Sequence, residues 1–110
     1  MLPTISTITA TVSNILSSSK YSNNVLRIGV FGSVARDEAT NKSDIDLIID
    51  YQHTDNALNY IYFCSEIEEA FKALYNKTTS IVEAEALNYE EYAHIGKEIE
   101  KDAKWIYVKA

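Results

Sequence analysis

The 110-residue chain lacks several features that would assign it to a specialised class of protein. Its one cysteine, Cys64, excludes an internal disulfide and fits a reducing compartment. No apolar run approaches the roughly 20 residues of a membrane-spanning helix. The first residues, Met1 to Ile5, have neither the basic region nor the continuous apolar core of a signal peptide. These absences predict a cytoplasmic protein with no membrane association.

Positive charge is also scarce. Ten Lys and Arg residues face 16 Asp and Glu residues, which gives a net charge of −6. A polyanion would be repelled unless this charge were locally neutralised, and no cluster of basic residues does so. Direct nucleic-acid binding is therefore not expected. The charge favours a basic protein partner, or an anionic ligand that arrives with metal ions.

The apolar content of 46% supports a packed core, and the length predicts a single domain over residues 1–110. Apolar periodicity predicts the following elements: helix 4–18, strand 25–31, a short helix from Ser33 to about Glu38, strand 44–50, helix 55–75, strand 78–83 and a final helix 89–104. This order indicates an α/β (α+β) fold with a short mixed sheet of about three to four strands, flanked by helices. An apolar tail follows at 105–108 and must pack somewhere.

The helical stripes give specific expectations for the core. Helix 55–75 should bury one stripe and the final helix another, through these residues: Tyr60, Cys64, Ile67, Phe71 and Leu74, then Tyr92, Ile95, Ile99 and Ala103. Cys64 is expected to be a core residue. His53 and His94 have no acid or cysteine at metal-ligand spacing, so we expect surface or packing roles for both.

Two carboxylates at the start of the second strand form the first half of a candidate site. Successive strand side chains point to opposite faces, so Asp44 and Asp46 project together while Ile45 and Leu47 face apolar surroundings. Two carboxylates this close repel each other unless a cation lies between them. Mg²⁺ prefers oxygen ligands and commonly combines one or two carboxylates with substrate phosphates. A solvated strand start is the simpler alternative.

The other half precedes these acids by ten residues. Gly32 follows the strand 25–31 and lets a phosphate approach the backbone, because it has no Cβ atom. Ser33 adds a hydroxyl donor and can cap the short helix whose first N–H groups favour an anion. Arg36 is one turn further on and can donate two hydrogen bonds to phosphate oxygens. Anion donors opposite metal-binding carboxylates are what phosphoryl transfer requires.

Two of these residues have a structural alternative. Arg36 could instead pair with Asp37 or Glu38 on the surface of a helix. Ser43 is as well explained as a loop cap as by contact with a substrate.

Taken together, these segments resemble the minimal nucleotidyltransferase (MNT) family of the polymerase β-like nucleotidyltransferase superfamily. The resemblance covers nearly the whole chain, and three segments carry it: Gly32-Ser33-Val34-Ala35-Arg36-Asp37-Glu38-Ala39, Ser43-Asp44-Ile45-Asp46-Leu47, and Ile99-Glu100-Lys101-Asp102-Ala103 before Trp105-Ile106-Tyr107.

The resemblance implies a function. ATP would be the donor and two Mg²⁺ ions the cofactors, and AMP would be transferred to an acceptor hydroxyl with release of pyrophosphate. Gly32 and Ser33, with Arg36 and Ser43 beside them, would bind the nucleotide, and Asp44 and Asp46 would bind the metals. Family members are typically encoded beside a HEPN-type (or HEPT) toxin, and some act as antitoxins by adenylylating a toxin tyrosine. A hetero-oligomer with such a toxin is expected. The short chain leaves no room for the domains with which larger relatives hold RNA or an antibiotic.

One departure from the family pattern concerns a third carboxylate on the next strand. The register set by the segment 85–88 places that position at Ser80, which supplies no charge to a metal. Glu83 could substitute, but three residues put it about 10 Å away along the strand and on the opposite face. Losing such a carboxylate commonly costs about 10²–10⁴ in rate. The alternative function is therefore a catalytically impaired MNT-like subunit that neutralises its toxin by binding alone.

Overall fold

A four-stranded mixed sheet forms the centre of the computed structural model, which describes residues 2–53 and 56–110. The strand order is β3-β2-β1-β4, with β1 at Val25–Phe31, β2 at Ile45–Tyr51, β3 at Thr79–Glu83 and β4 at Lys104–Val108. β1 is antiparallel to β2 and to β4, whereas β2 and β3 are parallel. The expected α+β fold with a short mixed sheet is confirmed.

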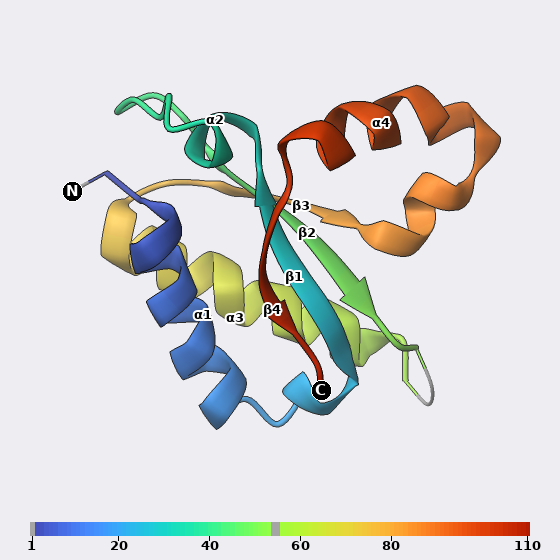
Figure 1. Cartoon of the computed structure of the whole chain (residues 1–110). Helices are drawn as coiled ribbons and strands as arrows, with labels where there is room; N and C mark the ends of the chain where they lie inside the picture. Colours follow the sequence, from blue (N-terminus) through green and yellow to red (C-terminus); the bar gives the residue numbers. More distant parts are fainter. Residues whose placement is uncertain (1, 54–55) are drawn as a thin grey trace.

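Helices cover both faces of this sheet (Figure 1). The α-helices are α1 (Ile5–Ser18), α2 (Gly32–Ala35), α3 (Leu58–Tyr75) and α4 (Ala93–Asp102), and short 3₁₀ turns lie at Ser22–Asn24 (η1), Ala84–Asn88 (η2) and Glu90–Tyr92 (η3). Thr4 caps α1, since its hydroxyl accepts a hydrogen bond from the Thr7 N–H and the Thr7 hydroxyl accepts one from the Thr4 N–H. Asn76 ends α3 in the left-handed conformation.

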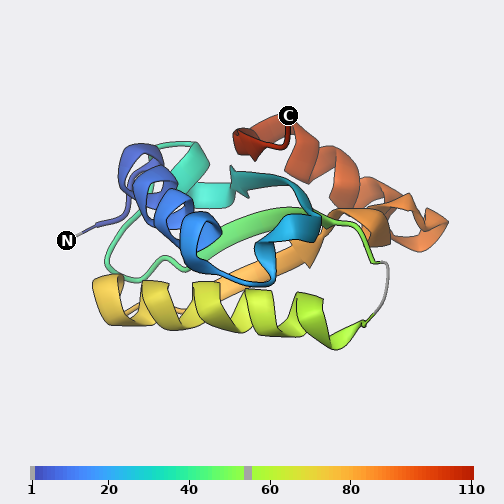
Figure 2. The ribbon, with the colours of Figure 1, turned by 90° about the horizontal axis from the view of Figure 1, so that it is seen from below.

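The core lies between the sheet and the pair α1 and α3, which cover one face, while α4 lies on the other (Figure 2). Ile45, Leu47 and Ile49 of β2 are fully buried on the α1/α3 side, as their alternation predicts. The side chains between them, including Asp46, point toward α4. This alternation separates the apolar core from the polar candidate site.

Several expectations about the elements were wrong. Leu74 is 55% exposed, and Phe63 and Tyr75 are buried on α3 in its place. The final helix is shorter than predicted because the 3₁₀ turn η3 takes up its first residues, and Tyr92 and Ile95 are exposed where burial was expected. Asp55, the predicted first residue of the long helix, lies outside the described residues.

The apolar tail forms the edge strand β4, beside β1. The sequence pattern did not show this, because the pairing joins segments about 75 residues apart in the chain. Trp105 of β4 is 38% exposed and not a core residue, and the Arg27 guanidinium lies 4.1 Å from its ring centroid. Among the described residues no helix is long and apolar enough to cross a membrane.

Candidate active site

The candidate site is organised by the turn that joins β1 to α2. Phe31 of β1 pairs with Asp46 of β2, so the next residue, Gly32, turns directly beside the Asp46 carboxylate. Gly32 has φ of +71°, and a Cβ atom there would lie 2.2 Å from Asp46 Oδ2. Both the backbone conformation and the space therefore require glycine. The carboxylate fills the volume that any other residue at position 32 would need.

The electrostatics of Asp44 and Asp46 favour a cation. Burial, and then the negative charge of Asp44, raise the pKa of the Asp46 carboxyl, while Arg36 lowers it. Neither carboxylate forms a hydrogen bond or a close ion pair with another described residue. Both oxygen pairs are thus available, and a divalent cation would relieve their repulsion. The pair fits Mg²⁺, which accepts one or two carboxylates together with phosphate oxygens.

Lys77 holds the loop that precedes Asp44. Its side chain is buried, and its ammonium group donates hydrogen bonds to the carbonyl oxygens of Thr40, Asn41 and Ser43, at 3.0, 3.0 and 2.7 Å. The Ser43 hydroxyl accepts a hydrogen bond from the Thr40 N–H at 2.9 Å. Ser43 thus closes the loop, which is the loop-cap role that the sequence left open for it. These four hydrogen bonds fix the entry of the chain into Asp44.

The other two predicted nucleotide-binding residues flank the Gly32 turn. α2 is shorter than predicted and begins at Gly32, with no side-chain cap, so the expected cap by Ser33 was wrong. The Ser33 hydroxyl has no hydrogen bond to another described residue and is free to contact a ligand. Arg36 forms an ion pair with Glu38 at 3.0 Å, which is one of the two partners that the sequence suggested for it. It also pairs with Asp102 at 2.6 Å. The second pair connects α2 to α4.

β3 carries no carboxylate beside these acids. Ser80 is the register partner of Asp46 on the adjacent parallel strand, and its side chain lines the same cleft. Glu83, the possible substitute, pairs in register with Ile49 and makes its side-chain contact with His53. It therefore lies away from Asp46, on the opposite face of the strand.

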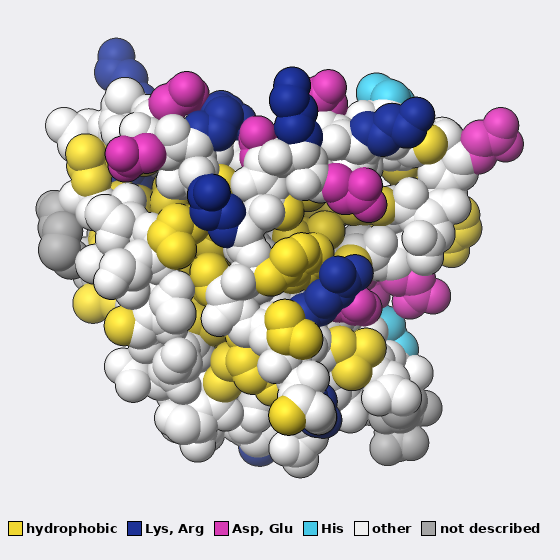
Figure 3. Space-filling view, in the orientation of Figure 1, with side chains coloured by type: hydrophobic (Ala, Val, Ile, Leu, Met, Phe, Trp, Pro, Cys, Tyr) yellow, Lys and Arg dark blue, Asp and Glu magenta, His cyan; other side chains and the backbone are white. Residues whose placement is uncertain are grey.

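α4 completes the site by closing a cleft of about 440 Å³ over Asp46. The Gly32 turn lines it together with charged and polar side chains from the sheet, from the end of α2 and from α4: Arg36, Asp46, Ser80, His94, Glu98 and Asp102. Acidic and basic side chains gather over α2 and α4 in the space-filling view (Figure 3). The three α4 residues were missed from the sequence as site residues. The sequence pattern that could have revealed them is their spacing of four residues, which places His94, Glu98 and Asp102 on one face of the helix.

Of the residues expected at the site, Gly32, Arg36 and Asp46 line this cleft, whereas Ser33, Ser43 and Asp44 are next to them in the chain but do not line it. A glycine turn beside a free carboxylate is an arrangement that suits phosphoryl-group chemistry. The chain matches the family model for polymerase beta nucleotidyltransferases over residues 11–110. It therefore belongs to this nucleotidyltransferase family.

The similar proteins are of two kinds. The protein adenylyltransferase MntA of Thermococcus cleftensis is 38% identical over 58 residues, which is 53% of this chain. The match spans about half the length of that relative (54%). Two structural neighbours share the fold at low identity. One is a toxin–antitoxin complex with AMP-PNP (TM-score 0.64, 13% identity, 92% of this chain and 73% of the other). The second is a tri-AMPylated Shewanella oneidensis HEPN toxin in complex with an MNT antitoxin (TM-score 0.61, 11% identity, 96% and 73%).

Proposed function

We propose that this chain is an Mg²⁺-dependent protein adenylyltransferase that transfers AMP from ATP to a tyrosine of a HEPN-type toxin and so acts as its antitoxin. The observation that carries the proposal is the Asp46 carboxylate packed against Gly32 in a cleft of about 440 Å³, with Asp44 two residues before Asp46 in the chain. The cleft is in the size range of small-molecule sites. Family membership and the similarity to an adenylyltransferase support the chemistry. The complexes among the structural neighbours support the partner.

Each residue has a role in this proposal. The Ser33 hydroxyl and the backbone at Gly32 contact the triphosphate, with Arg36 at the edge of the cleft as a further phosphate contact. Ser43 acts by closing the loop that positions Asp44. Asp44 and Asp46 would hold Mg²⁺, and two ions are expected. When bound, Mg²⁺ neutralises the triphosphate and makes its α-phosphorus more electrophilic.

The transfer exchanges one phosphorus–oxygen bond for another. The acceptor oxygen bonds to the α-phosphorus of ATP, the bond to the β-phosphate oxygen breaks, and pyrophosphate leaves with the electron pair of that bond. The acceptor hydroxyl must lose its proton in this step, and Ser80 is no useful base by itself. His94 and Glu98 of α4 line the same cleft and are the titratable groups that can accept this proton.

The direct test is to incubate the protein with ATP, Mg²⁺ and the toxin encoded beside it, and to measure the intact mass of the toxin. We expect the added mass of AMP on a tyrosine, and no addition with the Asp44→Asn/Asp46→Asn double variant. A folded toxin whose mass stays unchanged with the wild-type protein would refute the enzymatic proposal.

A second candidate function is neutralisation of the toxin by binding alone, which the serine beside Asp46 on β3 favours. Co-expression in cells separates the two proposals. Under the enzymatic proposal, the Asp44→Asn/Asp46→Asn variant fails to suppress toxicity although it still co-purifies with the toxin. Full suppression by this variant would show that binding is sufficient. The cytoplasmic location remains a prediction and rests on the single cysteine.

A further inference from the structure

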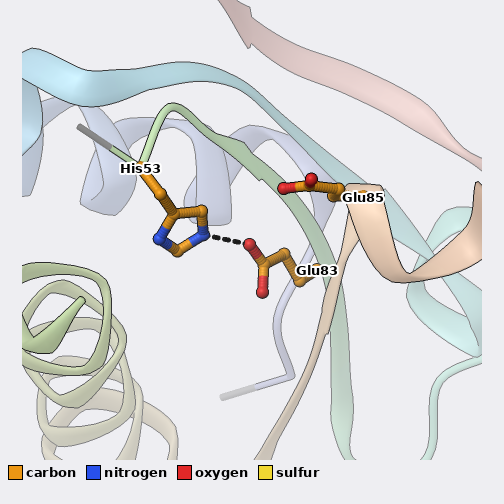
Figure 4. A group of neighbouring side chains, drawn as sticks. All are labelled: His53, Glu83 and Glu85. Carbon is orange, nitrogen blue, oxygen red and sulfur yellow. Dashed lines mark hydrogen bonds and ion pairs between the residues drawn. The ribbon is translucent and has the colours of Figure 1, made fainter.

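A second cluster of possible metal ligands lies at the other end of the sheet. His53 follows β2, Glu83 is the last residue of β3, and Glu85 belongs to η2. One ligand atom from each lies within 4.8 Å of the others, and His53 Nε2 contacts Glu83 Oε1. Figure 4 shows the three side chains converging from these separate segments. His53 lies seven positions after Asp46 in the chain, which corresponds to about 23 Å of extended backbone.

The His53 ring is held in place by its neighbours. Its centroid lies 5.4 Å from that of Tyr51 and 5.3 Å from that of Tyr60, in tilted and edge-on geometry. Tyr51 is buried, so the imidazole packs against the core edge although it reaches solvent. The ring is therefore ordered with Nε2 directed at the carboxylates. Metal-ligating histidines require such an imposed orientation.

The charge of the cluster is unbalanced. Glu83 and Glu85 bring two carboxylates together, and no described Lys or Arg forms an ion pair with either. The nearby Arg27 is engaged with Asp50 at 3.1 Å. A divalent cation would neutralise both carboxylates while keeping the imidazole nitrogen as a neutral ligand.

We propose that His53, Glu83 and Glu85 form a Zn²⁺ site distinct from the Asp44/Asp46 pair. A nitrogen ligand beside two carboxylates favours a transition metal over Mg²⁺ or Ca²⁺, which prefer oxygen ligands alone. Ligand atoms about 2.1 Å from a tetrahedral ion lie about 3.4 Å apart. Glu85 is exposed and reaches this spacing by a change of rotamer, and water takes the fourth position.

Such an ion would link three segments of the fold. His53 fixes the end of β2, Glu83 the end of β3, and Glu85 the first turn of the connection 84–92. That connection leads directly into α4, which closes the nucleotide cleft. Zn²⁺ binding would therefore stabilise the chain on both sides of the sheet edge and restrain the helix above the cleft.

The experiment is a Zn²⁺ titration against a chromogenic chelator, with the Asp44→Asn/Asp46→Asn variant as background so that the cleft does not bind the ion. We expect one Zn²⁺ per chain and a rise in melting temperature on binding. His53→Ala and Glu85→Gln should each weaken Zn²⁺ binding by roughly tenfold or more, since each removes a ligand. Circular dichroism confirms the folding of each variant. Glu85→Gln changes only an exposed side chain, so it keeps the test valid if His53→Ala misfolds.

The chain offers a matched control, because His94 is its only other histidine. His94→Ala should leave Zn²⁺ affinity unchanged. The proposal is overturned if the background variant takes up no Zn²⁺. It is equally overturned if His53→Ala and Glu85→Gln bind Zn²⁺ as well as the background does, or if His94→Ala abolishes binding.

Discussion

The Asp46 carboxylate occupies the space into which a Cβ atom of residue 32 would project, with Oδ2 2.2 Å from that position. Gly32 directly follows β1 and Asp46 lies on β2, so the antiparallel pairing of the two strands brings the two halves of the motif together. A glycine turn and a carboxylate separated by 13 residues in sequence thus form one steric unit. Substitutions of Gly32, Asp46, Ser80 and Lys77 test this unit and the residues that support it.

Replacing Gly32 with alanine should abolish AMP transfer. The substitution forces a positive φ on a residue with a side chain and displaces Asp46, which we expect to destabilise the fold by about 1–3 kcal/mol. Transfer assays and chemical denaturation measure the two effects. Gly96→Ala is the control. Gly96 lies inside α4, and a Cβ atom there would be 3.5 Å from Leu87 Cβ, which is an ordinary van der Waals distance. It should be neutral or stabilise the fold by up to about 1 kcal/mol. Wild-type transfer by Gly32→Ala would contradict the steric argument.

Asp46→Asn should inactivate the protein yet raise its melting temperature at pH 7 in EDTA. Burial and the charge of Asp44 raise the pKa of the Asp46 carboxyl, so its charged form costs stability above that pKa. The cost disappears as the pH falls below the unfolded value of 3.8, where both states are protonated. The gain of the variant should therefore vanish near pH 3. Asp50→Asn, which loses the Arg27 ion pair, should not raise the melting temperature. A lower melting temperature for Asp46→Asn at pH 7 would contradict the prediction.

Ser80→Asp should increase the rate of AMP transfer by roughly tenfold or more, because it places a carboxylate beside Asp46 on the adjacent strand. Single-turnover assays at saturating ATP measure the rate. Glu98→Gln tests the alternative proton acceptor from α4. It should lower the transfer rate more when introduced into the wild-type protein than when introduced into the Ser80→Asp variant. An unchanged rate for Ser80→Asp would show that residue 80 does not limit catalysis.

Lys77→Met should loosen the loop in front of Asp44. The three carbonyl oxygens lose a buried charged donor, and we expect a loss of about 2–3 kcal/mol in the free energy of unfolding. Weaker Mg²⁺-dependent ATP binding should accompany it, measured by calorimetry. Lys72→Met removes an exposed lysine from α3 and should change stability by less than about 0.5 kcal/mol. Equal effects of the two substitutions would exclude a specific role for Lys77.

The Cys64 thiol should react slowly with thiol reagents in the folded protein. Burial raises its pKa from 9.0 to about 11, which lowers the thiolate fraction near neutral pH by about 100-fold. Modification by iodoacetamide at pH 8, followed by mass spectrometry, should be complete only in denaturant. Fast modification of the native protein would place Cys64 outside the core.

Predictions from local patterns were good where a single element decides the outcome. The first strand was predicted with the observed bounds, and the alternation across β2 correctly separated buried Ile45 from Asp46. Predictions failed where burial depends on a neighbour. Leu74 has the right helical spacing, but the next residue, Tyr75, takes the buried position and packs against Phe71. The fate of the apolar tail required knowledge of the pairing of β4 with β1.

The sequence by itself determined the central part of the site, because Gly32-Ser33 and Asp44-Ile45-Asp46 lie at the ends of two strands that neighbour each other in the chain. Strand alternation and a short connection then leave little freedom in how the two halves meet. Only the tertiary structure brought α4 over the cleft, joined Arg36 to Asp102, tied Lys77 to the loop, and gathered His53, Glu83 and Glu85. These contacts join residues 30 to 66 positions apart in the chain, and no periodicity within one element encodes them.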